Sequence, residues 1–166
     1  MFFCSSCAYH YRNNLSSFET DSISIYDIQN LTSEASLTAL LKNALGERIS
    51  QSPGLKLAKV NDENSDRLVL TLKKLDNRTV ARARLREKKS RDYEGDAYQS
   101  VLYRINASLS YELYQPSNKS KAFRKGTVKG QADLPRIHDR EVALKTALKQ
   151  LAIDLSENLL NELSER

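Results

Sequence analysis

The clearest structural signal in the chain lies in residues 101–114, which read VLYRINASLSYELY. Every odd-numbered position carries an apolar or aromatic side chain, and polar side chains fill most of the even-numbered positions. A period of two places successive side chains on opposite faces of a β-strand. The stretch therefore predicts a long antiparallel strand with one buried face and one open face.

Two further strands are expected to lie beside this one. Residues 121–134 follow a polar turn at residues 115–120, and they favour an edge strand or a strongly bent strand because they are rich in small side chains. These small residues are Ala122, Gly126, Gly130 and Ala132. Residues 67–86 also alternate, with a change of parity at Leu75 that indicates a bend or a bulge. If the three segments form a meander, their basic residues run along the strands instead of gathering at one tip.

Two segments have the spacing of amphipathic helices. The first ends at about Ser50, and Thr32 or Ser33 is expected to cap its start because a hydroxyl can accept the free backbone N–H groups there. The second runs from Asp139 to about Ser164. Their apolar stripes are Leu37, Leu41, Ala44, Leu45 and Ile49 in the first helix, and Leu144, Leu148, Leu151, Leu155 and Leu159 in the second.

The remaining elements complete the predicted fold. Residues 22–28 are expected to form a first strand, either central or buried on both faces, and residues 55–60 a short second strand. The order is then β-α-β-β-β-β-α, which predicts an α+β fold. We expect a two-layer α/β sandwich over residues 21–166, with two helices packed on one face of a mixed, largely antiparallel sheet. The other face of the sheet is left to solvent or to a partner.

Positive charge is concentrated in two windows of this 166-residue chain, whose formal net charge is +5. Residues 73–91 contain nine Lys/Arg and two acids, and residues 119–129 contain five Lys/Arg and no acid. Such asymmetry indicates an anionic partner for one face, such as phosphate, nucleic acid or acidic lipid. The alternative is that these residues only keep two strands and a loop soluble.

The candidate ligand-binding residues come from these two windows. Arginine favours bidentate contact with phosphate, whereas lysine acts as a point charge. Alternate positions of a strand share one face, which groups the arginines of the first window. The candidates are Arg82, Arg84, Arg86, Lys88, Lys89 and Arg91 in the first window, and Lys121, Arg124, Lys125 and Lys129 in the second.

Motifs for catalysis and for cofactor binding are missing from the sequence. It contains no glycine-rich phosphate loop, no HExxH zinc motif and no GxSxG nucleophile motif. The two histidines, His10 and His138, lie far apart, and Cys4 and Cys7 have no second cysteine pair with which to complete a zinc site. We therefore expect a binding protein with no enzymatic activity, no cofactor and no metal.

The first residues resemble the end of a bacterial lipoprotein signal. Ser5 and Ser6 are small residues directly before Cys7, as a lipoprotein signal peptidase requires, and Phe2 and Phe3 fit the remnant of an apolar run. We therefore interpret residues 1–20 as a lipoprotein lead-in with a truncated signal remnant, with Cys7 as the lipidated residue. The alternative is that both cysteines are ordinary intracellular cysteines.

Four stretches, in this order, resemble the LptE family of lipopolysaccharide-assembly lipoproteins. CAYHYRNN (7–14) resembles the opening of the family after its lipidated cysteine, although Ala8 stands where glycine is usual. SISIYDIQNLTSEASLTALLKNALGERI (22–49) resembles its first strand and helix. LYRINASLSYELYQ (102–115) and REVALKTALKQLAIDLSENLLNEL (140–163) resemble its long strand and its C-terminal helix.

The resemblance implies an outer-membrane lipoprotein on the periplasmic face of a Gram-negative envelope. Family members plug the large β-barrel LptD and help to deliver lipopolysaccharide, and their basic residues are implicated in contact with the phosphorylated lipid. Two alternatives remain open. One is a different periplasmic lipoprotein that activates a cell-wall enzyme. The other is a nucleic-acid-binding domain, which is disfavoured because Tyr103 and Tyr111 share the buried parity of their strand instead of standing among the arginines.

Overall fold

The helices and strands occur in the predicted order. The structure is a computed structural model that describes residues 21–60, 62–84, 98–136 and 139–164. Its elements are β1 (Ser22–Asn30), α1 (Ser36–Gln51), β2 (Lys56–Leu57), β3 (Asp66–Arg84), β4 (Tyr98–Tyr114), β5 (Arg124–Pro135) and α2 (Arg140–Ser164). Neither helix is long and apolar enough to span a membrane within these residues.

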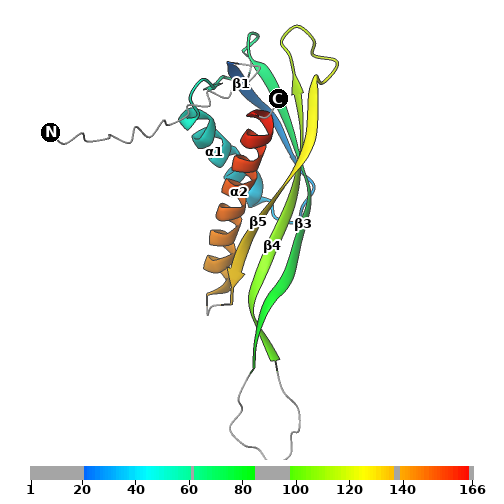
Figure 1. Ribbon diagram of the computed structural model, residues 1–166. Coiled ribbons are helices and arrows are strands. Elements are labelled where there is room, and N and C mark those ends of the chain that lie inside the picture. The colour runs from blue at the N-terminus through cyan, green and yellow to red at the C-terminus, as the bar shows by residue number, and fades with distance from the viewer. Residues whose placement is uncertain (1–20, 61, 85–97, 137–138, 165–166) are drawn as a thin grey trace, which may run out of the picture.

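The five strands form one mixed sheet in the order β2-β1-β3-β4-β5. β1 is parallel to both β2 and β3, whereas β3, β4 and β5 form the expected antiparallel meander. Both helices pack on the same face of this sheet (Figure 1). The α+β prediction is therefore confirmed, with β1 between β2 and β3 and with β5 at one edge.

The core lies between the helices and the odd-numbered face of β4. Ile105, Ala107, Leu109, Tyr111 and Leu113 are all buried on this face. The alternation does not predict burial along the whole strand, because Val101 has the same odd parity and is 37% exposed. The ends of β3 and β4 project beyond the start of α2, so no helix covers them (Figure 1).

A close contact between β5 and α2 explains one glycine in the edge strand. A Cβ atom built on Gly130 would lie 2.7 Å from Leu155 Cγ and 3.2 Å from the Leu155 backbone nitrogen. Real Cβ atoms essentially never approach a heavy atom so closely. Buried alanines at 143, 147 and 152 similarly reduce the bulk of α2, as their positions in the sequence suggest.

The start of α1 differs from the prediction. The residue before its first turn is Ala35, which provides no side-chain cap, so neither Thr32 nor Ser33 caps this helix. The Thr32 hydroxyl instead contacts the loop, where it accepts the N–H of Glu34 at 3.3 Å. Asn30 organises this loop by donating to Glu34 O and by accepting from the N–H and the hydroxyl of Thr32.

Two strand boundaries and the burial of β1 also differ from the prediction. The strand expected at 55–60 is only Lys56–Leu57, because a turn follows in which the Asp62 N–H donates to Lys59 O. The strand expected from 121 begins at Arg124, after a longer turn. In β1, Tyr26 is 48% exposed, so this strand is not buried on both faces.

The change of parity near Leu75 comes from a bulge in β3. The register with β4 shifts between Leu72 and Lys74, so that the following residues exchange faces. Two further shifts lie between Thr79 and Arg82. The predicted bend is therefore confirmed, and the bulges determine which basic residues of β3 share a face.

Candidate binding face of the sheet

The helices leave one face of β3, β4 and β5 uncovered, which we call the open face. In the part of the chain that the structure describes, no element packs over it (Figure 1). Even-numbered residues of β4 lie here because the odd-numbered ones face the helices. Residues directly opposite each other on paired strands share a face, so the register defines the rest of the surface.

The open face consists of cross-strand rows that are almost entirely polar. From one end to the other, the rows across β3, β4 and β5 are Arg67–Tyr114, Val69–Glu112–Lys125, Thr71–Ser110–Thr127, Lys74–Ser108–Lys129, Asp76–Asn106–Gln131 and Arg78–Arg104–Asp133. They contain six Lys/Arg and three carboxylates. The surface is therefore cationic, with short hydroxyl and amide side chains between the charges.

Two of these cations are neutralised by neighbours. Lys74 Nζ lies 2.7 Å from Asp76 Oδ2. Arg104 donates from Nε and Nη2 to the two carboxylate oxygens of Asp133, at 2.7 and 3.1 Å. This hydrogen bonding raises the pKa of Arg104 and lowers the pKa of Asp133, so both groups remain charged at neutral pH.

One carboxylate of the open face has a different partner. Glu112 accepts the hydroxyl hydrogen of Tyr114, and this hydrogen bond raises the pKa of that hydroxyl. Lys125 stands directly across the strand from Glu112 but makes no ion pair with it. The Tyr114–Glu112 contact therefore occupies an acidic group that could otherwise pair with Lys125.

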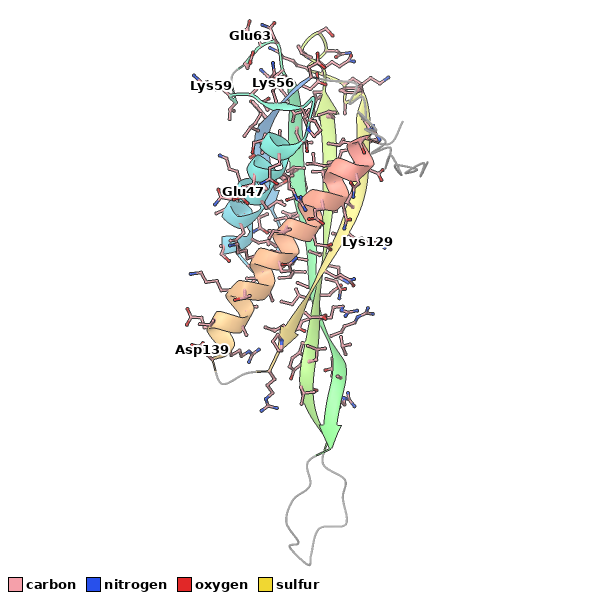
Figure 2. The ribbon with its side chains drawn as sticks, turned by 60° about the vertical axis from the view of Figure 1, so that its left-hand side comes forward. Glu47, Lys56, Lys59, Glu63, Lys129 and Asp139 are labelled. Atoms are coloured by element: carbon pink, nitrogen blue, oxygen red, sulfur yellow. The ribbon has the colours of Figure 1, made fainter. Side chains whose placement is uncertain are left out.

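Three exposed cations on the open face have no ion-pair partner among the described residues. They are Arg78, Lys125 and Lys129. Lys129 projects from β5 away from α2 (Figure 2). β4 brings the two basic windows together, because Lys74 and Lys129 both stand beside Ser108. The sequence does not single out Lys74 and Arg78, because the bulge at 72–74 decides their face. Arg104 lies outside both basic windows, on the even-numbered face of β4.

Two arginines chosen from the first window, Arg82 and Arg84, lie on the uncovered end of β3 (Figure 1). Arg82 is exposed and stands opposite Ser100, whose hydroxyl lies 3.3 Å from that of Thr79. Arg84 is the last residue of β3 and is paired with Tyr98. Five predicted residues lie outside the described part of the chain, namely Cys7, Arg86, Lys88, Lys89 and Arg91.

Two candidates from the second window are separated from the open face. Arg124 donates to the carbonyl oxygens of Leu163, at 3.0 Å, and Glu162. It therefore lies at the C-terminus of α2, where a cation is favoured by the helix dipole. Lys121 lies exposed in the turn before β5 and not in the strand.

One aromatic residue near the arginines was missed from the sequence. The guanidinium carbon of Arg67 lies 5.0 Å from the centre of the Tyr26 ring, and this ring is 48% exposed. Tyr111, by contrast, is buried as its parity predicts. A strand over 22–28 that is buried on both faces would bury Tyr26, whereas the β1 register shifts between Ile25 and Asp27.

The comparisons with known proteins show a likeness of fold. No family model matches the sequence, and no curated protein matches it. A hypothetical protein from Chlamydia trachomatis has a TM-score of 0.55 and 9% identity, over 87% of this chain and 96% of that chain. PelC from Paraburkholderia phytofirmans, solved as a dodecamer, has a TM-score of 0.50 and 13% identity, over 89% of each chain.

Bacterial lipoproteins are also among the similar solved structures. Rare lipoprotein B from Shewanella oneidensis has a TM-score of 0.48 and 14% identity, over 86% of this chain and 93% of that chain. At such identities, the two neighbours that reach a TM-score of 0.50 establish a shared fold and nothing beyond it.

Arg124 and Lys125 are adjacent basic residues for which the structure predicts opposite effects. Arg124→Gln should lower the free energy of unfolding by about 1–2 kcal/mol, because it removes charged hydrogen bonds to the end of α2. Lys125→Gln should leave stability within about 0.5 kcal/mol, because the side chain is exposed and makes no such bond. Urea denaturation of both variants measures this, and equal losses would contradict the assignment of Arg124 to the helix terminus.

Proposed function

We propose that the protein is a non-enzymatic lipoprotein of the Gram-negative outer membrane that takes part in lipopolysaccharide transport and assembly. In this role it binds lipopolysaccharide and supports an LptD-like β-barrel on the periplasmic side. The lipid attached at Cys7 would hold it at the membrane. This proposal combines the chain-long resemblance to the LptE family with the properties of the open face.

The observation that carries the proposal is the open face itself. Arg78, Lys125 and Lys129 are exposed there without ion-pair partners among the described residues. Exposed cations on a rigid sheet attract phosphate groups without first having to break an internal ion pair. The helices on the other side provide a core that keeps this surface in place.

The open face also suits a large ligand better than a small deep-bound one. Its rows cover three strands, and its serine, threonine and asparagine side chains offer hydrogen bonds between the charges. An amphipathic glycolipid presents both phosphates and hydroxyl groups to such a surface. A barrel wall with polar, acidic side chains would match the same surface.

Binding to purified lipopolysaccharide tests the proposal. The full chain should be retained by lipopolysaccharide at about 0.15 M salt, where long-range attraction between exposed charges is screened. Phosphatidylglycerol vesicles and single-stranded DNA serve as anionic controls, and both should bind more weakly. Equal binding to all three would reduce the interaction to unspecific charge attraction, and preferential binding to DNA would favour the nucleic-acid alternative.

The barrel partner requires a separate measurement. The tagged protein, purified from detergent-solubilised envelopes of its source bacterium, should bring down an LptD-like barrel that mass spectrometry identifies. Recovery of a cell-wall synthase in place of the barrel would instead support the role of an enzyme activator.

A further inference from the structure

A pocket of about 550 Å³ lies on the open face near the middle of β5. Its lining takes in Lys74, Ser108 and Lys129 from one row of the open face. The next row contributes Asp76, Asn106 and Gln131. The volume lies within the range of about 300–1,000 Å³ that is usual for small-molecule sites.

Two residues of α2 reach around the edge of the sheet to complete the pocket. Asp154 Oδ2 accepts the backbone N–H of Gln131 at 2.8 Å, and Asn158 Nδ2 donates to the carbonyl oxygen of Lys129 at 3.0 Å. These bonds satisfy two backbone groups that an edge strand would otherwise expose. They also fix both side chains, so that the second oxygen of Asp154 and the amide oxygen of Asn158 can accept further hydrogen bonds.

The charges of the lining cancel. Lys74 and Lys129 are balanced by Asp76 and Asp154, and Lys74 is already paired with Asp76 at 2.7 Å. A phosphate in the pocket would meet two carboxylates as well as two lysines, so the lining offers it no net attraction. The pocket therefore differs in chemistry from Arg78 and Lys125, which flank it on the open face.

The lining also includes Ala107 and Gly130, and its other residues mix donors with acceptors. Lys129 donates, Asp154 accepts, and Ser108, Asn106 and Gln131 do both. A hydroxyl group is itself a donor and an acceptor, so a ligand with several adjacent hydroxyls matches this arrangement. We propose that the pocket binds a saccharide unit through its hydroxyl groups, while the unpaired cations beside it take charged substituents of the same glycan.

The position of the flanking cations fits this division. Arg78 lies four residues from Lys74 along β3, and Lys125 lies four residues from Lys129 along β5. At about 3.3 Å per residue, each cation lies about 13 Å from the central row. That separation allows a sugar in the pocket and an anionic group of a neighbouring sugar on the open face. The inference rests on the proposed function only in taking the glycan to come from the envelope.

Nuclear magnetic resonance of the full ¹⁵N-labelled chain tests the proposal with three probes. These are dephosphorylated lipopolysaccharide core oligosaccharide, chitobiose as an amino sugar of the peptidoglycan type, and inorganic phosphate at matched ionic strength. At least one saccharide should shift the amide signals of Ser108, Lys129 and Gln131 saturably, with a millimolar Kd because the contacts replace bonds to water. The saccharide that binds more tightly shows whether the glycan comes from lipopolysaccharide or from peptidoglycan.

Matched variants locate the interaction. Lys129→Ala should weaken saccharide binding about tenfold, and Gln131→Ala should weaken it as well without changing charge. Lys145→Ala removes an exposed lysine from α2 outside the pocket and should leave the affinity unchanged. Shifts caused by phosphate alone, no response to either saccharide, or equal affinity in Lys129→Ala would each overturn the proposal. If Lys129→Ala leaves saccharide affinity unchanged and lipopolysaccharide still binds, the pocket proposal fails while the proposed function stands.

Discussion

Leu155→Ala is expected to lower the free energy of unfolding by about 2–5 kcal/mol, which is the range for a fully buried leucine. Leu155 has no exposed surface and lies in the apolar stripe of α2. Its side chain is also the part of α2 that touches β5 at Gly130. The loss of stability therefore measures the contact between α2 and the edge strand β5. Urea denaturation followed by circular dichroism measures it.

A double-mutant cycle with Gly130 makes this prediction specific. Gly130→Ala alone should be destabilising, because the new Cβ would lie 2.7 Å from Leu155 Cγ. In the double variant, the added methyl group meets the space that the leucine has left. The two losses should then sum to more than the loss in the double variant, by at least about 0.5 kcal/mol.

Gly126→Ala provides the matched control for this cycle. Its added Cβ would meet the ring of Tyr111 and not Leu155. The losses of Gly126→Ala and Leu155→Ala should therefore add. Simple addition in the Gly130 cycle as well would show that β5 and α2 do not meet as described.

Lipopolysaccharide binding is expected to weaken at least about tenfold when three charges are removed from the sheet layer outside the pocket. The variant combines Arg78→Gln, Arg82→Gln and Lys125→Gln. All three side chains are exposed and have no ion-pair partner among the described residues, so stability should change little. Their combined effect on binding should decrease as salt is raised, because exposed charges are screened.

The control removes the same charge from the opposite layer. Lys42→Gln, Lys145→Gln and Lys149→Gln alter exposed lysines on α1 and α2. Each triple variant removes three positive charges from a chain whose formal net charge is +5. If binding depends on net charge alone, both variants lose affinity equally, and the open face is not the binding surface.

The fold was predictable because two periodic patterns dominate the sequence. The odd-numbered apolar residues of β4 and the leucine stripe of α2 can be satisfied together only by a helix on one face of a sheet. Boundaries were less predictable where local hydrogen bonds decide them. Asn30 contacts both Thr32 and Glu34, which delays the start of α1, and no periodicity contains that information.

The sequence predicts where basic residues are concentrated, but it does not predict which of them share the open face. The two basic windows are visible in the sequence, and the meander explains how β4 joins them. The bulge at 72–74 places Lys74 and Arg78 on the open face, and its position in the register depends on the packing of the whole sheet. Arg124 appears equivalent to Lys125 in sequence, yet alternation and the end of α2 give it a different role.

Site-specific photo-crosslinking in living cells tests most directly whether the open face contacts lipopolysaccharide. A photoreactive phenylalanine analogue is placed at Thr127 on the open face or at Lys149 on α2, both of which are exposed. We expect an adduct with lipopolysaccharide from position 127 and none from position 149. An adduct from position 149 alone, with both proteins folded, would show that lipopolysaccharide contacts the helix layer and not the open face.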